Sequence, residues 1–338
     1  MGGRTVYFYD MDLTRLRLLM ELERLGTMAA VAEVAGMGTS AVSKHFAVLE
    51  KEVGVPLLVP DGRRVRLTPA GHRLAEYAVD ILGRVEAARA ELSGHGEPVG
   101  RVDLATFVSL LSPVVLPALA RLGAGHPGVD VRIIENEPDE ALALLQNGGA
   151  DLALVYEYSL VPRRFPDSLR LHLVGTEPLL LSQPSSDPHA DSRPLTRSRL
   201  RRLSGARWIA NSRGGDDDEL VGRMCAAAGF APEIGHRVDN LEVVERMVAA
   251  GLAVGVMPKL AAATRRGVVH SPLGELGGHR RIYLVGRAGA WAWLPTRLVA
   301  RELHTAAAEV LDGVAPLPAD ETAPLPGEGP GAAGAPAP

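Results

Sequence analysis

The sequence predicts an α/β protein built from a small helical N-terminal unit with a β-hairpin, one long helix, and a large unit of alternating strands and helices. Three observations support this. Apolar residues keep helical spacing from Met11 to Gly54, an Asp-Gly turn follows between two short apolar runs, and β-like runs alternate with helical ones beyond Gly100. A chain of 338 residues is long enough for two or three such units with separate cores.

Composition excludes several classes of protein. The chain is 46% hydrophobic and 22% charged, which is ordinary for a soluble globular protein. Its one cysteine, Cys225, cannot form an internal disulfide and lies in an apolar helical run, so we expect a buried, unreactive thiol. No run approaches the roughly 18 consecutive apolar residues of a membrane span, and residues 1–10 lack a signal-peptide core. We expect a cytoplasmic protein without a membrane partner, in which residues 1–10 are a loose extension or the true start is Met11.

Three short helices are expected between Met11 and Gly54. Gly26-Thr27 and Gly36-Met37-Gly38 interrupt the helical spacing, since glycine permits sharp turns, and Thr27 and Thr39 can cap the helices that follow. The apolar residues with helical spacing are Leu13, Leu16, Leu19, Met20, Val31, Val34, Ala35, Val42, Phe46, Leu49 and Val53.

The third helix has two different faces. Val42, Phe46, Leu49 and Val53 share one side, and the opposite side carries Ser40, Lys44, Ala47 and Lys51. A short, polar and basic face suits a helix that enters the major groove of DNA, where Lys and Ser reach phosphates and base edges. The same pattern is equally typical of a solvated helix face.

The hairpin that follows favours the DNA interpretation. Arg63, Arg64 and Arg66 crowd its tight turn, where a wing could reach the DNA backbone or minor groove. Residues 38–73 contain six basic and three acidic side chains, a local charge of +3, although the whole chain carries −4. That overall charge argues against a protein that coats nucleic acid generally.

A long helix is expected from Thr68-Pro69 to about Leu92. The threonine can cap the helix, and proline suits the first helical position. An apolar stripe with four-three spacing runs along it, which indicates either a dimer interface or packing against its own unit. The stripe consists of Leu74, Ala78, Ile81, Val85, Ala88 and Leu92, and residues 93–98 form a plausible hinge after it.

Beyond Gly100 the alternation predicts a mostly parallel sheet covered on both faces, divided into two sub-lobes. Ligands in such folds bind beyond the carboxyl ends of the strands. The last 26 residues, 313–338, contain seven Pro, seven Ala and five Gly, which predicts a disordered tail.

Long segments of the chain resemble the LysR-type transcriptional regulators, over about residues 11–312. The resemblance is carried without gaps by residues 26–50 and 62–71, and more loosely by His126-Pro-Gly-Val-Asp-Val-Arg-Ile, Gly149-Ala-Asp-Leu-Ala-Leu-Val and Ala249-Ala-Gly-Leu-Ala-Val-Gly-Val-Met-Pro. It implies a winged helix-turn-helix at 11–67, a linker and dimerisation helix at 68–94, and a two-lobed effector domain at 100–312 like the type 2 periplasmic binding proteins. Lobe I would comprise about 100–174 and 268–312, and lobe II about 175–267.

Carried over by motif position, the family's DNA contacts fall on Thr39, Ser40, Ser43 and Lys44, with Arg63 and Arg64 in the wing. The chain also departs from the family. Gly38 stands where serine is usual, Thr39 where glutamine is frequent, and Leu58-Val-Pro60 where the family has Phe-x-Arg. The missing arginine removes one expected backbone contact and points to an altered operator preference.

The resemblance also implies an effector site between the lobes. Ser109, in the run Ala105-Thr-Phe-Val-Ser109, falls where the family has a Ser or Thr after the first strand. A hydroxyl beside free helical N–H groups suits a carboxylate or another anion, and the same residue could simply cap a helix. Asn211, Ser212 and Asn240 occupy comparable positions in lobe II. Tyr156 could line the cleft or pack in the core.

Nothing in the sequence assembles a catalytic or metal site. The ten histidines lack metal-ligand spacing, Asp216–Glu219 suits a helix N-terminus, and Gly214-Gly215 is a turn and not a phosphate-binding loop. We therefore expect no enzyme, no cofactor and no metal.

The expected function is a sequence-specific transcription regulator controlled by a small-molecule effector. Its expected partners are operator DNA, an anionic effector, RNA polymerase, and further copies of the chain in a homodimer or homotetramer. The alternative is a small-molecule-binding protein or an enzyme that uses the α/β half without regulating DNA. The missing signal segment and the missing catalytic constellation argue against that alternative.

Overall fold

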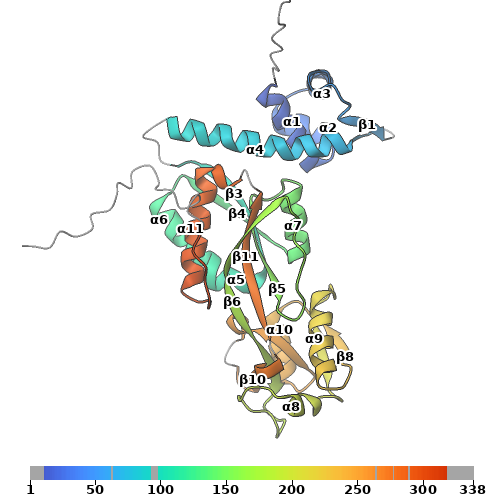
Figure 1. Cartoon of the computed structure of the whole chain (residues 1–338), viewed down its shortest axis with the longest axis vertical. Helices are drawn as coiled ribbons and strands as arrows, with labels where there is room; N and C mark the ends of the chain where they lie inside the picture. Colours follow the sequence, from blue (N-terminus) through green and yellow to red (C-terminus); the bar gives the residue numbers. More distant parts are fainter. Residues whose placement is uncertain are drawn as a thin grey trace, which may run out of the picture.

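The computed structural model describes residues 11–61, 64–92, 98–262, 265–276, 278–287 and 290–317. The N-terminal helical unit lies at one end of an elongated molecule, the helix α4 crosses beneath it, and the α/β unit extends to the other end (Figure 1). The predicted extension at 1–10, the hinge at 93–97 and most of the predicted tail lie outside the described residues.

The N-terminal unit has the three helices and the hairpin that the sequence predicts. These are α1 (Leu13–Leu25), α2 (Met28–Ala35), α3 (Thr39–Val53) and the antiparallel strands β1 (Leu58–Asp61) and β2 (Arg64–Leu67). The apolar side of each helix faces one core, which therefore stabilises all five elements together. The largest fully buried side chains of this core are Leu16, Leu19, Phe46, Leu49 and Leu57.

The helix caps differ from the prediction at one position. Thr27 caps α2 as expected, and its side chain accepts a hydrogen bond from Ala30 N–H at 3.3 Å. The predicted cap at Thr39 is wrong, because Thr39 is already the first helical residue and Gly38 occupies the cap position of α3. Gly38 has no side chain to accept a hydrogen bond, so α3 begins without a side-chain cap.

Helix α4 (Pro69–Leu92) packs partly against its own unit. Thr68 Oγ1 accepts a hydrogen bond from Gly71 N–H at 3.0 Å at its start. Ala75 and Ala78 are buried in the N-terminal core, and Ile81 is partly buried beside them. The first half of the predicted stripe therefore contacts α1 within the same chain, as the second interpretation of that stripe requires.

One half of the α/β unit contains strands in the order β4-β3-β5-β11-β6. Strands β3 (Gly100–Thr106), β4 (Val129–Glu135) and β5 (Leu152–Tyr158) are parallel, whereas β11 (His279–Arg287) runs antiparallel to both β5 and β6 (Leu169–Pro184). The expectation of a mostly parallel sheet is therefore wrong, because β11 runs antiparallel to β5 and β6, and β6 runs antiparallel to β9 (Val254–Pro258) in the other half.

The other half is built around the second part of β6. Strand β9 (Val254–Pro258) and strand β10 (Val268–Pro272) pair with β6 from Leu179 onwards, and β7 (Arg207–Ala210) and β8 (Glu233–Arg237) follow beyond β9. The pairing of β10 corrects the expected return to lobe I at about residue 268, since that return lies after Pro272. We call the two halves lobe I and lobe II.

Helices cover the sheet on both sides. Residues Val108–Gly125 form one apolar helical stretch with the length and composition of a membrane span, although Arg121 and two serines interrupt it. Its side chains Leu110 and Val114 lie in the main hydrophobic core, so packing accounts for its composition. The helical elements are α5 (Val108–Leu110), η1 (Leu111–Val115), α6 (Leu116–Gly125), α7 (Pro138–Gln146), α8 (Arg197–Arg201), α9 (Asp216–Ala227), α10 (Leu241–Ala249), η2 (Lys259–Ala261), η3 (Gly274–Leu276), η4 (Ala290–Ala292) and α11 (Leu294–Ala308).

Candidate functional site

The outer face of α3 carries all four residues predicted to contact DNA from this helix. Thr39, Ser40, Ser43 and Lys44 are exposed, and the apolar side chains of the opposite face are buried in the N-terminal core. The face therefore offers hydroxyl groups and one positive charge to solvent without any bulky side chain in front of them.

The hairpin beside α3 is fixed to it by one carboxylate. Glu50 Oε1 accepts hydrogen bonds from the N–H groups of Leu57 and Leu58, at 2.8 and 2.9 Å, so α3 holds the start of β1 directly. Arg64 begins β2, whereas Arg63 lies outside the described residues. The start of the hairpin is thus bonded directly to the helix that carries the exposed face.

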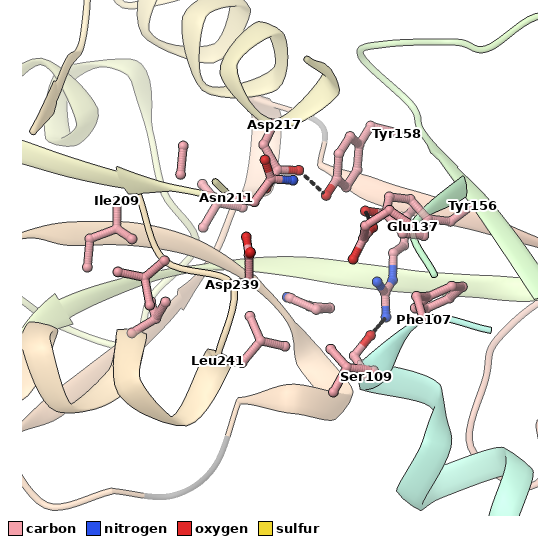
Figure 2. Close-up of a pocket in the computed structure, with 17 residues that line it drawn as sticks. Phe107, Ser109, Glu137, Tyr156, Tyr158, Ile209, Asn211, Asp217, Asp239 and Leu241 are labelled. Carbon is pink, nitrogen blue, oxygen red and sulfur yellow. Dashed lines mark hydrogen bonds between the residues drawn. The ribbon is translucent and has the colours of Figure 1, made fainter. Parts of the chain in front are cut away.

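A cavity of about 80 Å³ lies between lobe I and lobe II (Figure 2). Its wall comes from both lobes: the start of α5, the start of α7 and the end of β5 on one side, and the end of β7, the start of α9 and the start of α10 on the other. The polar lining residues are Ser109, Glu137, Tyr156, Tyr158, Asn211, Asp217, Asp239 and Arg280.

Arg280 connects Ser109 to a buried carboxylate. Its Nη2 donates to Ser109 Oγ at 2.6 Å, and its Nε donates to Glu177 Oε2 at 2.6 Å. Arg280 is 3% exposed and Glu177 1% exposed, so the two charges form a buried ion pair. The other Glu177 oxygen accepts a hydrogen bond from Leu260 N–H at 2.6 Å, which ties the pair to η2.

The guanidinium group of Arg280 also lies over two aromatic rings. Its carbon is 4.8 Å from the ring centroid of Phe107 and 5.1 Å from that of Tyr156. These contacts and the Glu177 carboxylate hold the guanidinium in place. Ser109 is therefore oriented by a fixed donor, and its positive neighbour is already neutralised.

Two phenol groups of β5 donate to two carboxylates that line the cavity. Tyr156 Oη donates to Glu137 Oε2 at 2.8 Å, and Tyr158 Oη donates to Asp217 Oδ1 at 2.6 Å (Figure 2). The second bond joins β5 of lobe I to α9 of lobe II. Burial raises the pKa of both tyrosines well above their usual value, so they remain protonated donors.

The pKa of the Asp217 carboxyl group is also strongly raised. Burial is the main cause that raises its pKa from 3.8 to about 6, and the negative charge of Glu137 adds to the effect. The hydrogen bond from Tyr158 acts in the opposite direction but does not compensate. The surroundings of Asp217 in the folded protein therefore disfavour the ionised form of its carboxyl group.

Two of the four predicted effector residues line the cavity. Ser109 and Asn211 do so, whereas Ser212 and Asn240 do not. Ser212 donates from its N–H and its hydroxyl to Asp239, at 2.7 and 2.5 Å, and so orients a carboxylate that lines the cavity.

Asn240 and Ser109 were both predicted at helix starts, but their roles in the structure differ. Asn240 caps α10, and its side chain accepts a hydrogen bond from Val243 N–H at 3.0 Å. Ser109 is not a helix cap, because Phe107 holds that position of α5. The hydroxyl of Ser109 is thus available to the cavity and to Arg280.

Sequence reasoning missed Glu137, Asp217, Asp239 and Arg280 as lining residues. One signal was available, because Arg280 lies in a strand whose other residues are largely apolar and its partner Glu177 lies in another such strand. A charge inside a buried strand requires a partner, so such a pair of strands indicates a buried ion pair. Tyr156, for which lining and packing were both open, does line the cavity.

Ion pairs join the lobes around the edge of the cavity. Arg213 of lobe II pairs with Glu140 of α7 at 3.2 Å. Arg163, in the connection after β5, bonds both Asp139 of α7 and Asp216 of α9. Each of these contacts stabilises the arrangement of the two lobes described here.

Neither metal nor thiol chemistry is supported by side chains in the described ranges. No group of three or more His, Cys, Asp or Glu residues that could hold a metal ion occurs there. Burial raises the pKa of Cys225 to about 12, so the thiol is protonated and a poor nucleophile.

A winged helix-turn-helix joined to a two-lobed domain with a cavity between the lobes defines the class of ligand-responsive DNA-binding regulators. Two family models match the chain: "Bacterial regulatory helix-turn-helix protein, lysR family" over residues 13–72, and "LysR substrate binding domain" over residues 95–308. The chain belongs to the LysR family of transcriptional regulators.

Known relatives cover most of the chain. The "Transcriptional dual regulator GltC" of Bacillus subtilis is 25% identical over 266 residues, which is 78% of this chain and 86% of GltC. The "Hydrogen peroxide-inducible genes activator" of Haemophilus influenzae is 25% identical over 309 residues, 90% of this chain and 100% of that protein. The solved structure of a full-length OxyR variant from Pseudomonas aeruginosa has the same fold, with a TM-score of 0.66, 20% identity, and coverage of 88% of this chain and 94% of that one.

Family membership establishes the general function. The chain is a DNA-binding transcription regulator with an effector-binding domain, and its relatives are regulators and not enzymes. The alternative of a binding protein or enzyme without DNA regulation is not favoured. LysR regulators bind DNA and small-molecule effectors and form oligomers.

Proposed function

We propose that this regulator reads its operator with Thr39, Ser40, Ser43 and Lys44 of α3 and holds the adjoining backbone with Arg63 and Arg64 of the wing. The observation that carries this proposal is the single exposed face on which all four α3 residues lie. Lysine contacts with phosphate supply affinity, and serine and threonine hydroxyls reach base edges. Glu50 keeps the wing beside this face.

We further propose that the effector binds in the cavity between the lobes, with an anionic or other acceptor group at Ser109. The Ser109 oxygen accepts a hydrogen bond from Arg280, which leaves its own O–H free to donate. Asn211 faces the same cavity from lobe II. A ligand that contacts both lobes stabilises one arrangement over another and so acts through differential affinity.

A peroxide switch through an internal disulfide does not suit this chain, although relatives are named for hydrogen peroxide. A disulfide requires two cysteines, and the sequence contains only Cys225. The burial and raised pKa of this thiol also slow its direct oxidation. Reversible binding of a small molecule is therefore the proposed signal.

The proposed working form is a homodimer or homotetramer in the cytoplasm that acts on RNA polymerase. The four-three apolar spacing of α4 supports a dimer contact along this helix, on which the large side chain of Tyr77 is 64% exposed. The proposed domains are 11–67, 68–94 and 100–312. The start of the segment expected to be a disordered tail instead contacts the effector domain, since Val314 packs against the main core and His304 Nε2 hydrogen-bonds the Ala315 carbonyl.

The DNA face is tested with Lys44→Ala and the DNA upstream of the protein's own gene. Operator affinity is expected to fall, and the slope of log affinity against log salt is expected to decrease by about 0.9, because one phosphate contact is lost. Arg201→Ala is the matched control, since it removes one positive charge from exposed α8 in lobe II. Equal affinity and slope in Lys44→Ala and wild type would contradict this DNA face.

The effector site is tested with Ser109→Ala and calorimetry, using metabolites made or consumed by the products of neighbouring genes. Loss of a hydrogen bond to a charged group is expected to weaken effector binding by about 1.5 to 3 kcal/mol. Ligand-free operator affinity should stay near that of wild type. Unchanged effector affinity in Ser109→Ala would remove this residue from the site.

The dimer contact is tested with Tyr77→Glu and sedimentation at low micromolar concentration. A charge in a packed helix interface is expected to shift the protein towards monomer. Since Tyr77 is exposed, the substitution leaves the N-terminal core intact. A variant that remains as oligomeric as wild type would place the interface elsewhere.

A further inference from the structure

We propose that the cavity takes a small zwitterion, with its protonated amine between Glu137 and Asp217 and its carboxylate at Ser109. This inference rests on the proposed effector site and adds the chemical class of the ligand. It narrows the expected anionic effector to one that also carries a positive charge, because the cavity wall is not basic.

Some of the charged side chains that line the cavity have an ion-pair partner, and others do not. Among the described residues, the one cationic lining side chain, Arg280, is neutralised by Glu177, which lies behind it. The carboxylate of Asp239 is 3.6 Å from Arg213. Neither Glu137 nor Asp217 forms an ion pair with any residue in the described part of the chain. Two carboxylates from opposite lobes therefore face the cavity without an ion-pair partner of their own, although the charge of Arg213 acts on Glu137.

The oxygen atoms around Glu137 and Asp217 can accept a further hydrogen bond, so a ligand with N–H or O–H donors suits this part of the cavity. Each of the two carboxylates accepts one phenol hydrogen bond and one from a backbone N–H, of Glu140 for Glu137 and of Asn211 for Asp217, and each can accept more. The Oδ1 atom of Asn211, in the same wall, is buried and has no hydrogen-bond partner among the described residues. The raised pKa of Asp217, about 6, agrees with a carboxylate that lacks a positive partner. An ammonium group supplies both three N–H donors and the missing charge.

The part of the cavity wall at Ser109 has donors instead. The Ser109 hydroxyl can donate, and the Arg280 guanidinium lies 2.6 Å from it. A ligand carboxylate at Ser109 and an ammonium at Asp217 would thus satisfy both parts of the wall. The cavity is also small, since an engineered cavity of about 150 Å³ is filled by benzene and this one measures about 80 Å³.

The test compares matched compounds on the full-length protein. 4-Aminobutyrate, putrescine and succinate share a four-carbon chain but carry a zwitterion, two ammonium groups or two carboxylates, and β-alanine and malonate form a shorter pair. Unfolding of the effector domain is followed by tryptophan fluorescence, because all three tryptophans, Trp208, Trp291 and Trp293, lie there. Bound ligand raises the midpoint by mass action.

The zwitterions are expected to stabilise the wild type and the dicarboxylates to have no effect. Asp217→Asn should weaken zwitterion binding about tenfold or more. Glu219→Gln is the matched control on the same helix, since its carboxylate pairs with Arg223 outside the cavity lining, and it should bind like wild type. Asp217→Asn removes a disfavoured charge and is expected to fold.

Three results would overturn the inference: stabilisation by succinate or malonate instead, no stabilisation by any ammonium compound, or the same loss of binding in Asp217→Asn and Glu219→Gln. The proposed function has its own readout. Dicarboxylate binding that Ser109→Ala weakens would keep the effector site and discard only the ammonium group. Operator binding and its dependence on Lys44 are unaffected by either result.

Discussion

The α3 face and the interlobe cavity are built in opposite ways. Thr39 to Lys44 form one continuous run on one helix, and the side chains predicted to contact DNA are exposed to solvent. The cavity takes its polar residues from seven segments between Ser109 and Arg280, several of them buried. A site on one helix is specified by local periodicity, whereas a site between lobes depends on the packing of the whole domain.

This difference also separates function from stability. A change on the α3 face removes a proposed contact with DNA and leaves the N-terminal core untouched, because the side chains of this face are exposed. A change in the cavity alters buried charges such as Arg280 and Glu177, on which the fold itself depends. Substitutions of the two regions should therefore have different effects on unfolding.

The largest effect is expected from Arg280→Met. The substitution leaves the Glu177 carboxylate buried with only the Leu260 N–H as a partner among the described residues, so the free energy of unfolding of the effector domain should fall by about 3 to 5 kcal/mol. Urea unfolding followed by tryptophan fluorescence reports this domain, since the N-terminal unit contains no tryptophan.

Two further variants sharpen this result. Arg246→Met breaks an exposed ion pair with Glu242 on α10 and should change stability by less than about 1 kcal/mol. The double variant Glu177→Gln with Arg280→Met should recover part of the loss, because no buried charge remains uncompensated. If Arg280→Met were no more harmful than Arg246→Met, the buried pair would not stabilise the domain.

The same contrast explains what the sequence could predict. Helical spacing placed α1 to α3 and the outward side of Lys44, because these depend on residues three and four apart. It found Ser109 and Asn211 only through family resemblance, and it missed Asp217, which was expected only to favour the start of α9. The partner of Asp217 is Tyr158, 59 positions earlier, and no local pattern connects them.

The lobe boundary shows the same limit. Strand β6 was predicted only from Leu179, yet it begins at Leu169 and carries the pairing of both lobes. Its first half includes polar residues such as His172 and Glu177, which break the apolar pattern. Those residues are accommodated by specific partners in the folded protein, and a periodicity argument does not include such partners.

An intermediate effect, dependent on pH, is expected from Asp217→Asn. The folded pKa of about 6 lies above the unfolded value of 3.8, so the folded state binds this proton more tightly. Ionised Asp217 therefore destabilises the domain: the penalty is absent below about pH 4 and complete above about pH 6. Asparagine removes it, and the variant should be more stable than wild type by about 1 to 2 kcal/mol at pH 7.5.

The measurement is the difference in free energy of unfolding between Asp217→Asn and wild type at pH 5, 6 and 7.5. This difference should widen as the pH rises. Glu219→Gln, at an exposed ion pair on the same helix, should show no such trend. A difference that stays constant with pH would mean that the carboxyl of Asp217 is not perturbed in the folded protein.

The smallest effect is expected on the DNA side, from Gly38→Ser. Gly38 holds the cap position of α3 with a φ of −76° and a ψ of 148°, which serine adopts freely, and an added Cβ would meet only Ser40 Oγ at 3.8 Å. The serine oxygen can accept a hydrogen bond from a free N–H in the first turn, so the free energy of unfolding of α3 should rise by a few tenths of a kcal/mol. This corresponds to about a twofold slower hydrogen exchange in α3. Exchange measured by mass spectrometry on peptides of α3 detects this change.

Thr27→Ala, which removes the existing cap of α2, serves as the opposite reference and should speed exchange in α2 by the equivalent of about 1 kcal/mol. Faster exchange in α3 of Gly38→Ser would show that the start of this helix is constrained by something other than its missing cap.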